Sequence, residues 1–247
     1  MSLETDTMKL DAVIFDLDGT LVDSEGLYFE SDRRFVERFC GVYDDEFRAE
    51  CIGMGTLPFC RLIKEKYQLA ESVDELVALK DNLYLETARG RIAAFPEMLK
   101  LVQAFSIERL PMAVASGSSL AVIHEILSLT GLAPYFTHLY SSESVPMPKP
   151  APDIFLHAAR QLEVNPAGCL VFEDSQHGVA AALAAGMRVV AVPFVMTEKG
   201  KAQFAKADFL FPSGMSGFTA EAVLDWIDSH YCLCEECSFF DFGLCED

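Results

Sequence analysis

The chain has 247 residues, 51% of them hydrophobic and 23% charged, which is typical of a globular protein with a sizeable buried core. No apolar run approaches the roughly 20 residues that span a bilayer, and residues 1–10 lack the apolar stretch of a secretory signal, so we expect a cytoplasmic protein. The formal charge of −19 argues against nucleic acid and anionic membranes as partners, because both are bound through Lys and Arg.

The first predicted element is a buried strand over residues 10–15, an apolar run rich in β-forming residues. A turn with two carboxylates, Asp16 and Asp18, follows it directly. Amphipathic helical patterns without a strand-like run between them come next, over 29–39, 56–67 and 73–89. Helices without strands, placed after the first strand, predict a small α-helical cap domain over residues 22–90.

From residue 91 onward, short apolar runs alternate with helical patterns. The predicted strands cover 111–115, 169–172 and 188–192, and the predicted helices cover 120–132, 153–162 and 179–185. This alternation predicts an α/β fold with a doubly wound parallel sheet, a Rossmann-like core built from residues 1–21 and 91–230.

Three of the predicted strands run directly into polar residues, which are Asp16/Asp18, Ser116/Gly117 and Glu173/Asp174. We expect these pairs to converge, because ligands of such sheets bind at the carboxyl ends of the strands. Mg²⁺ typically uses one or two carboxylates together with phosphate and water. One carboxylate of Asp16 and Asp18 can then attack phosphorus while the other moves a proton. For this pair taken alone, an acidic turn without chemistry is an equal alternative.

The segment from Asp16 to Ser24 resembles the first signature of the haloacid dehalogenase superfamily, whose members are mostly phosphatases. Three further resemblances follow in the same order along the chain: Ser116 after a strand, Lys149 in a Lys-Pro-Ala-Pro-Asp-Ile-Phe run, and Glu173-Asp174. Together these resemblances extend over residues 10–193. They imply an enzyme with Mg²⁺ as cofactor, in which Lys149 supplies the local positive charge that an anionic substrate needs on so acidic a protein.

The resemblance also implies a role for each site residue. Asp16 attacks phosphorus and becomes an aspartyl-phosphate, while Asp18 protonates the leaving oxygen and then activates water. The residues implied to bind the substrate phosphate are Thr20, Ser116, Gly117 and Lys149. The implied metal ligands are the Asp16 side chain, the Asp18 carbonyl and Asp174, with Glu173 as a direct or indirect ligand. For Thr20, steadying the turn is an equal alternative.

A helical insertion after the first signature resembles the group that contains β-phosphoglucomutase and sugar-phosphate phosphatases. The resemblance implies a phosphatase for a small phosphorylated metabolite, with sugar phosphates as the leading class. A phosphosugar mutase is the alternative, since Lys80 falls where the mutase places a cap lysine, whereas Tyr28 stands where the mutase carries His. A catalytically silent binding module is a minor alternative. Candidate substrate contacts in the cap are Glu25, Tyr28, Arg61 and Lys80.

The cysteines fall into two groups. Four are dispersed among apolar neighbours, as expected for buried thiols in a reducing compartment: Cys40, Cys51, Cys60 and Cys169. Four others lie in an acidic C-terminal tail over residues 231–247: Cys232, Cys234, Cys237 and Cys245. The tail contains a single C-x-x-C spacing, whereas a structural zinc site usually pairs two, so a solvent-facing or partner-docking tail is favoured over metal or redox use.

Overall fold

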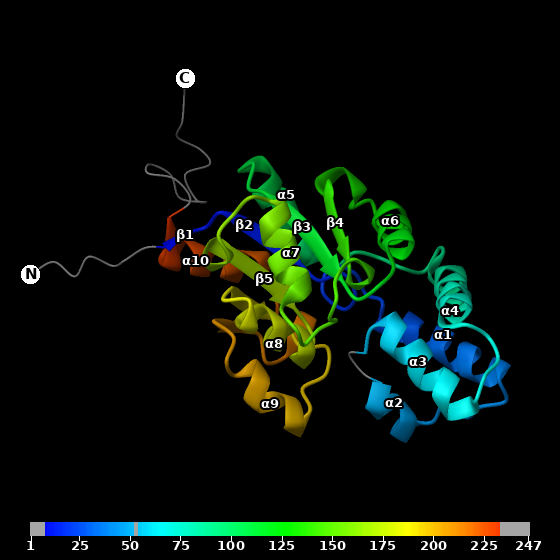
Figure 1. The fold of residues 1–247 in the computed structure, drawn as a ribbon. Coiled ribbons are helices and arrows are strands. Elements are labelled where there is room, and N and C mark those ends of the chain that lie inside the picture. Colours follow the sequence, from blue (N-terminus) through cyan, green and yellow to red (C-terminus); the bar gives the residue numbers. More distant parts are fainter. Residues whose placement is uncertain (1–7, 52–53, 233–247) are drawn as a thin grey trace, which may run out of the picture.

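The computed structural model describes residues 8–51 and 54–232 (Figure 1). Its centre is a six-stranded parallel sheet with the strand order β4-β3-β2-β5-β6-β7. The strands, in chain order, are β2 (Ala12–Phe15), β3 (Met112–Ser116), β4 (His138–Ser141), β5 (Cys169–Glu173), β6 (Arg188–Ala191) and β7 (Phe209–Leu210). This confirms the predicted doubly wound α/β fold.

Strand β2 lies in the middle of the sheet and contributes to both faces. Val13 and Phe15 pack with α5 (Pro96–Ile107), α6 (Leu120–Leu129) and α10 (Ala220–His230). Ala12 and Ile14 pack on the opposite face with α7 (Asp153–Gln161), α8 (Gln176–Ala184) and α9 (Glu198–Phe204). Because successive side chains of a strand alternate between faces, a strand covered on both sides is apolar throughout, as this run is.

The two edge strands and one small sheet were not predicted. Strand β4 contains His138 and Tyr140 and is only partly buried, so it lacks the continuous apolar run of a central strand. Strand β7 has two residues. A separate parallel pair joins β1 (Met8–Lys9) to β8 (Tyr231–Cys232) and brings the two ends of the described chain together.

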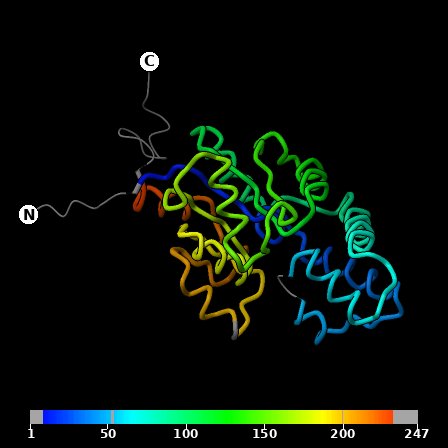
Figure 2. Tube along the Cα trace, viewed as in Figure 1, coloured from blue at the N-terminus to red at the C-terminus, as the bar shows by residue number. Residues whose placement is uncertain are grey.

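Four helices lie between β2 and α5, and we call them the helical insertion: α1 (Glu25–Arg38), α2 (Asp45–Cys51), α3 (Thr56–Tyr67) and α4 (Val73–Ala88). They pack around a core of their own that includes Phe35, Phe59 and Ile63. Figures 1 and 2 show them grouped at the end of the molecule toward which β3 points. Helix α4 begins with a capping box between Ser72 and Glu75.

The chain enters and leaves the helical insertion at one place. The backbone N–H of Asp23 donates to the carbonyl of Ala93 at 3.0 Å, and the N–H of Phe95 donates to the carbonyl of Leu21 at 3.0 Å. The two crossing segments are therefore hydrogen-bonded to each other beside the end of β2. This pairing fixes the insertion close to the carboxyl edge of the sheet.

The dispersed cysteines are mostly buried, as expected. Cys51, Cys60 and Cys169 are buried free thiols, but Cys40 is exposed. Cys40 follows the end of α1 with a φ of 56°, in a turn that leaves the helical core. The C-x-x-C motif of the tail lies outside the described residues. Within the described part of the chain, no helix is both long and apolar enough to cross a membrane.

Candidate active site

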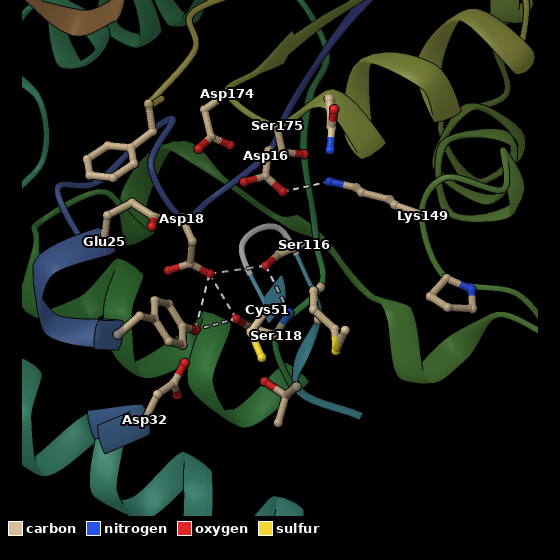
Figure 3. Close-up of a pocket in the computed structure, with 18 of the residues that line it drawn as sticks. Asp16, Asp18, Glu25, Asp32, Cys51, Ser116, Ser118, Lys149, Asp174 and Ser175 are labelled. Atoms are coloured by element: carbon tan, nitrogen blue, oxygen red, sulfur yellow. Dashed lines mark hydrogen bonds and ion pairs between the residues drawn. The ribbon is translucent and has the colours of Figure 1, made fainter. Parts of the chain in front are cut away.

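The three strand ends and the loop that carries Lys149 meet at one cavity. Its core wall is formed by residues at or just after the ends of β2, β3 and β5, which are Asp16, Asp18, Ser116, Gly117, Ser118, Asp174 and Ser175, together with Lys149. Figure 3 shows Asp16, Asp174 and Lys149 close together, with Asp18 and Ser116 beside them. The expected convergence of distant segments is therefore present in the structure.

Lys149 is the central cation of the core wall. Its Nζ lies 2.6 Å from Asp16 Oδ1, 2.5 Å from Glu173 Oε1 and 3.1 Å from the carbonyl oxygen of Ala115. Burial raises the pKa of Asp16 to about 8, with Glu173 adding to the rise and Lys149 opposing it. Burial alone would lower the pKa of Lys149, but the two carboxylates outweigh it and raise the pKa above its usual value. The lysine therefore stays charged.

Glu173 supports this arrangement from behind. It is fully buried and is not among the described residues that line the cavity. One oxygen accepts from Lys149, and the other accepts from the backbone N–H and the hydroxyl of Ser175, both at 3.0 Å. Of the two metal roles expected for Glu173, this placement fits the indirect one, because both oxygens are engaged inside the fold.

Asp18 is held by hydroxyl groups from the core and from the helical insertion. Its Oδ2 accepts from Ser118 at 2.8 Å, and more distantly from Tyr28 at 3.3 Å and Ser116 at 3.4 Å. Its Oδ1 accepts from Tyr84 at 3.2 Å. Burial raises the pKa of Asp18, and the hydrogen bonds act in the opposite direction. The rings of Tyr28 and Tyr84 are stacked, with their centroids 3.9 Å apart.

The turn after Asp18 is pressed against Asp174. Gly19 has a φ of 76°, and a Cβ at this position would lie 2.4 Å from Asp174 Oδ2, so the turn requires glycine. Thr20 is fully buried, and its Oγ1 has no hydrogen-bond partner among the described residues. Thr20 is also not among the described residues that line the cavity. Thr20 thus lies inside the fold, outside the described lining of the cavity.

Two carboxylates of the cavity form a donor set that fits Mg²⁺. Asp16 and Asp174 are both buried and both line the cavity. Burial raises the pKa of Asp174 well above its usual value, and the charges of Glu173 and Asp16 add to this. Such a pair is stabilised by a cation, and Mg²⁺ needs only one or two carboxylates besides water and phosphate. In the described residues, no three acidic, His or Cys side chains are grouped for a metal.

The helical insertion forms the opposite wall of the cavity. Three of its expected contacts, Glu25, Tyr28 and Lys80, do line the cavity. Lys80 is buried, and its Nζ lies 2.8 Å from Asp32 Oδ1 and about 5 Å from the ring centroids of Tyr28 and Phe59. Lys80 is therefore already paired within the insertion.

Arg61 is a correction to the sequence analysis. It is exposed and is not among the described residues that line the cavity. Helix α3 turns Phe59, Cys60 and Ile63 into the core of the insertion, which leaves Arg61 on the solvent side.

Several residues of the site were not predicted from the sequence. Ser118 lies in the Ser-rich run directly after β3, so its position just after a strand could have identified it as a site residue. Tyr84, Asp32 and Arg48 lie on helices of the insertion, and Tyr84 reads there as an ordinary core residue. Only the packing of these helices on the sheet shows that they face the site.

Residues 13–192 match the haloacid dehalogenase-like hydrolases, and the chain belongs to that family. The bifunctional riboflavin kinase/FMN phosphatase of Arabidopsis thaliana is 34% identical over 195 residues, which are 78% of this chain and 51% of that protein. The chain thus spans about half the length of this relative. Fructose-1-phosphate phosphatase YqaB of Escherichia coli is 34% identical over 182 residues, which are 73% of this chain and 95% of that protein.

Among solved structures, β-phosphoglucomutase from Clostridium difficile superimposes with a TM-score of 0.74, covering 89% of this chain and 98% of that chain. Its identity of 22% makes this a similarity of fold alone. The family and its phosphatase relatives identify the chain as a phosphoric monoester hydrolase, as the sequence signatures predicted.

Proposed function

We propose that the chain is a Mg²⁺-dependent phosphatase that hydrolyses a small phosphate monoester through an aspartyl-phosphate on Asp16. The observation that carries this proposal is the contact of 2.6 Å between Asp16 Oδ1 and Lys149 Nζ inside the cavity. The ammonium group neutralises the carboxylate and stands where the phosphoryl oxygens gather negative charge. An anionic phosphate is repelled less by a carboxylate that is paired with a cation than by an unpaired carboxylate.

Asp18 carries the proton through both half-reactions. In the first, Asp16 forms a bond to phosphorus as the bond to the leaving oxygen breaks, and Asp18 gives its proton to that oxygen. In the second, Asp18 takes a proton from water, whose oxygen attacks phosphorus, releases inorganic phosphate and restores Asp16. The raised pKa of Asp18, caused by burial, supports its holding a proton before the first step.

The remaining core residues bind and orient the phosphoryl group. Ser116 is buried and lines the cavity, and its hydroxyl, which contacts Asp18 only at 3.4 Å, can donate to a phosphoryl oxygen instead, while Ser118 keeps its hydrogen bond to Asp18. Asp16 and Asp174 would hold Mg²⁺, which when bound offsets the negative charge of the carboxylates and of the phosphate. Glu173 keeps Lys149 in position through its contact of 2.5 Å.

Two features support a small metabolite, with sugar phosphates first, as the substrate. The relatives named above act on FMN and fructose 1-phosphate, both of which are small phosphate esters. The helical insertion covers the cavity opposite the core wall, so the group attached to phosphorus must fit between the two. We propose that the insertion serves as a cap that excludes bulk water and selects this group.

Hydrolysis is favoured over a phosphosugar mutase reaction. The relatives that are 34% identical are phosphatases, whereas the similarity to β-phosphoglucomutase concerns the fold alone. Within the insertion, Lys80 is paired with Asp32 rather than turned freely to a sugar. A mutase would convert β-glucose 1-phosphate to glucose 6-phosphate when given a bisphosphate primer, and a phosphatase releases inorganic phosphate instead.

The test is a release assay with p-nitrophenyl phosphate and a panel of phosphorylated metabolites, with Mg²⁺ and after chelation with EDTA. We expect activity that requires Mg²⁺ and disappears in Asp16→Asn, together with phosphate trapped on Asp16 in the wild type, detected by mass spectrometry. Asp225→Asn, an exposed carboxylate on α10, controls for the loss of one negative charge. Hydrolysis by Asp16→Asn at the wild-type rate would refute the assigned nucleophile.

A further inference from the structure

Three cations line the cavity among the described residues, and only two of them are paired there. Lys149 contacts Asp16 and Glu173, and Lys80 contacts Asp32. Arg48 has no ion pair or hydrogen bond in the described part of the chain. On a protein with a formal charge of −19, a positively charged side chain left unpaired in a substrate cavity is unusual and points to a missing anion.

The packing of Arg48 leaves its hydrogen-bond donors free. The guanidinium carbon lies over the Phe29 ring, 4.4 Å from its centroid, so a cation–π contact holds the group. The N–H donors of a guanidinium lie in its plane and point away from its faces. A ring contact uses none of these donors, so Arg48 is held in place and remains able to bind a carboxylate or phosphate with two parallel hydrogen bonds.

Arg48 also stands on the wall opposite the proposed phosphate site. It lies on α2 three residues before Cys51, so both share one face of the helix, and both line the cavity. Figure 3 shows Cys51 and Asp32 apart from Asp16, Asp174 and Lys149. A ligand whose phosphate lies at Asp16 would present its far end to this wall.

Two acids of the helical insertion, Asp32 and Glu25, also line the cavity. Asp32 is paired with Lys80. The charge of Arg48 does lower the pKa of Glu25, against the larger opposing effect of burial, but the two side chains are not within ion-pair distance of each other. Neither carboxylate forms an ion pair with Arg48 within the described structure. The cavity therefore offers two separate anion sites, one on the core and one on the insertion.

We propose that Arg48 is a specificity-determining residue that binds a second anionic group of the substrate, a carboxylate or a second phosphate, remote from the scissile phosphate. This inference rests on the proposed phosphatase function and narrows its substrate class to phosphomonoesters with two separate anionic groups. A phosphomonoester whose sugar carries no second charge would leave the Arg48 donors unpaired and would bind less well.

Matched substrate pairs test this directly. 3-Phosphoglycerate and glycerol 3-phosphate differ by a carboxylate in place of a hydroxymethyl group, and fructose 1,6-bisphosphate and fructose 1-phosphate differ by one phosphate. In Arg48→Gln, we expect kcat/KM for the second-anion member of the preferred pair to fall roughly tenfold to a hundredfold. The partner with one anion should change by less than about threefold. Arg48→Lys, which keeps the charge but not the planar fork, should lie between them.

Arg38→Gln is the matched control, because Arg38 is an exposed arginine of the same insertion that is not among the described residues lining the cavity. It should leave both members of each pair unchanged. Equal losses for both members in Arg48→Gln, or a wild type without preference for the second anion, would overturn the inference while leaving the phosphatase assignment intact. A wild type that hydrolyses no phosphomonoester at all would overturn the proposed function, and this inference with it.

Discussion

The two walls of the cavity each contain a lysine that is largely shielded from solvent, and the two lysines differ in what they contact. On the core wall, Lys149 binds the oxygen of Asp16 and lies 4.9 Å from the ring centroid of Phe155. On the insertion wall, Lys80 binds Asp32 and lies 4.9 Å from the ring centroid of Tyr28. Both are cations beside a carboxylate and an aromatic ring, yet only Lys149 touches the proposed nucleophile.

This difference suggests a catalytic role for Lys149 and a structural role for Lys80. Residues at strand ends are positioned by the register of a sheet that is buried on both faces, so Asp16, Ser116 and Glu173 occupy fixed places. Residues of the insertion are positioned by helix packing, and a buried charge there needs a partner for the helices to fit together at all. We therefore expect the loss of Lys149 to affect turnover, and the loss of Lys80 to affect mainly stability.

The largest effect on activity is expected for Lys149→Met. Removing the ammonium leaves Asp16 and Glu173 side by side without a cation, and it removes the positive charge from the phosphoryl site. We expect kcat/KM to fall roughly a hundredfold to a thousandfold, the range found when one electrostatic contact to a transition state is lost. The measurement is steady-state hydrolysis with Mg²⁺. A loss below tenfold would mean that Lys149 is not needed at the phosphate.

Lys80→Met should reduce stability strongly and activity only slightly. It leaves Asp32 in the insertion without its cation, so we expect a loss of about 3 kcal/mol in the free energy of unfolding. We expect kcat/KM to fall by less than about tenfold, since the proposed chemistry uses the core wall. Urea unfolding measures the stability, and the double variant Lys80→Met/Asp32→Asn should recover a substantial part of it. A stable single variant with strongly reduced turnover would instead assign Lys80 to the substrate.

A smaller effect is expected for Tyr84→Phe, which removes one hydroxyl from the Asp18 network and keeps the stacked ring. The cost should be the loss of one hydrogen bond of ordinary strength, about 1 kcal/mol, which corresponds to a roughly threefold to tenfold lower kcat with little change in KM. Tyr135→Phe is the control, because it removes a hydroxyl that accepts from Gln103 on a residue that is not among those described as lining the cavity. An unchanged kcat for Tyr84→Phe would show that Asp18 is positioned by the core alone.

The contrast between the walls also explains what the sequence predicts and what it does not. The strand that ends at Asp16 is recognisable because a fully buried strand is apolar without interruption, and its polar successors are therefore conspicuous. The same reasoning places Ser116 and Asp174 at one edge of the sheet. The edge strand β4 was not predicted, because half-buried residues such as His138 and Tyr140 interrupt the apolar run.

The insertion is recognisable as helical but not as a binding wall. Helical periodicity identifies which side of α4 is buried. Tyr84 is buried against Asp18, whereas Leu76 is buried against the insertion core. The sequence pattern shows that both are buried but not which of them faces the site. The docking angle of the helices decides which of them meets the site. This angle depends on many weak packing contacts and on the pairing of the two crossing segments, neither of which has a local signature.

Arg61→Gln should have the smallest effect of all, and it tests the orientation of α3. The arginine is exposed, and its helix turns Phe59 and Ile63 toward the insertion core, so neither substrate nor core should sense its loss. We expect kcat/KM to change by less than about twofold and stability by less than about 0.5 kcal/mol. A decrease in kcat/KM that is confined to one substrate would require α3 to rotate toward the cavity during turnover. In that case substrate selection would have to be assigned to residues of α3 instead of residues of α2.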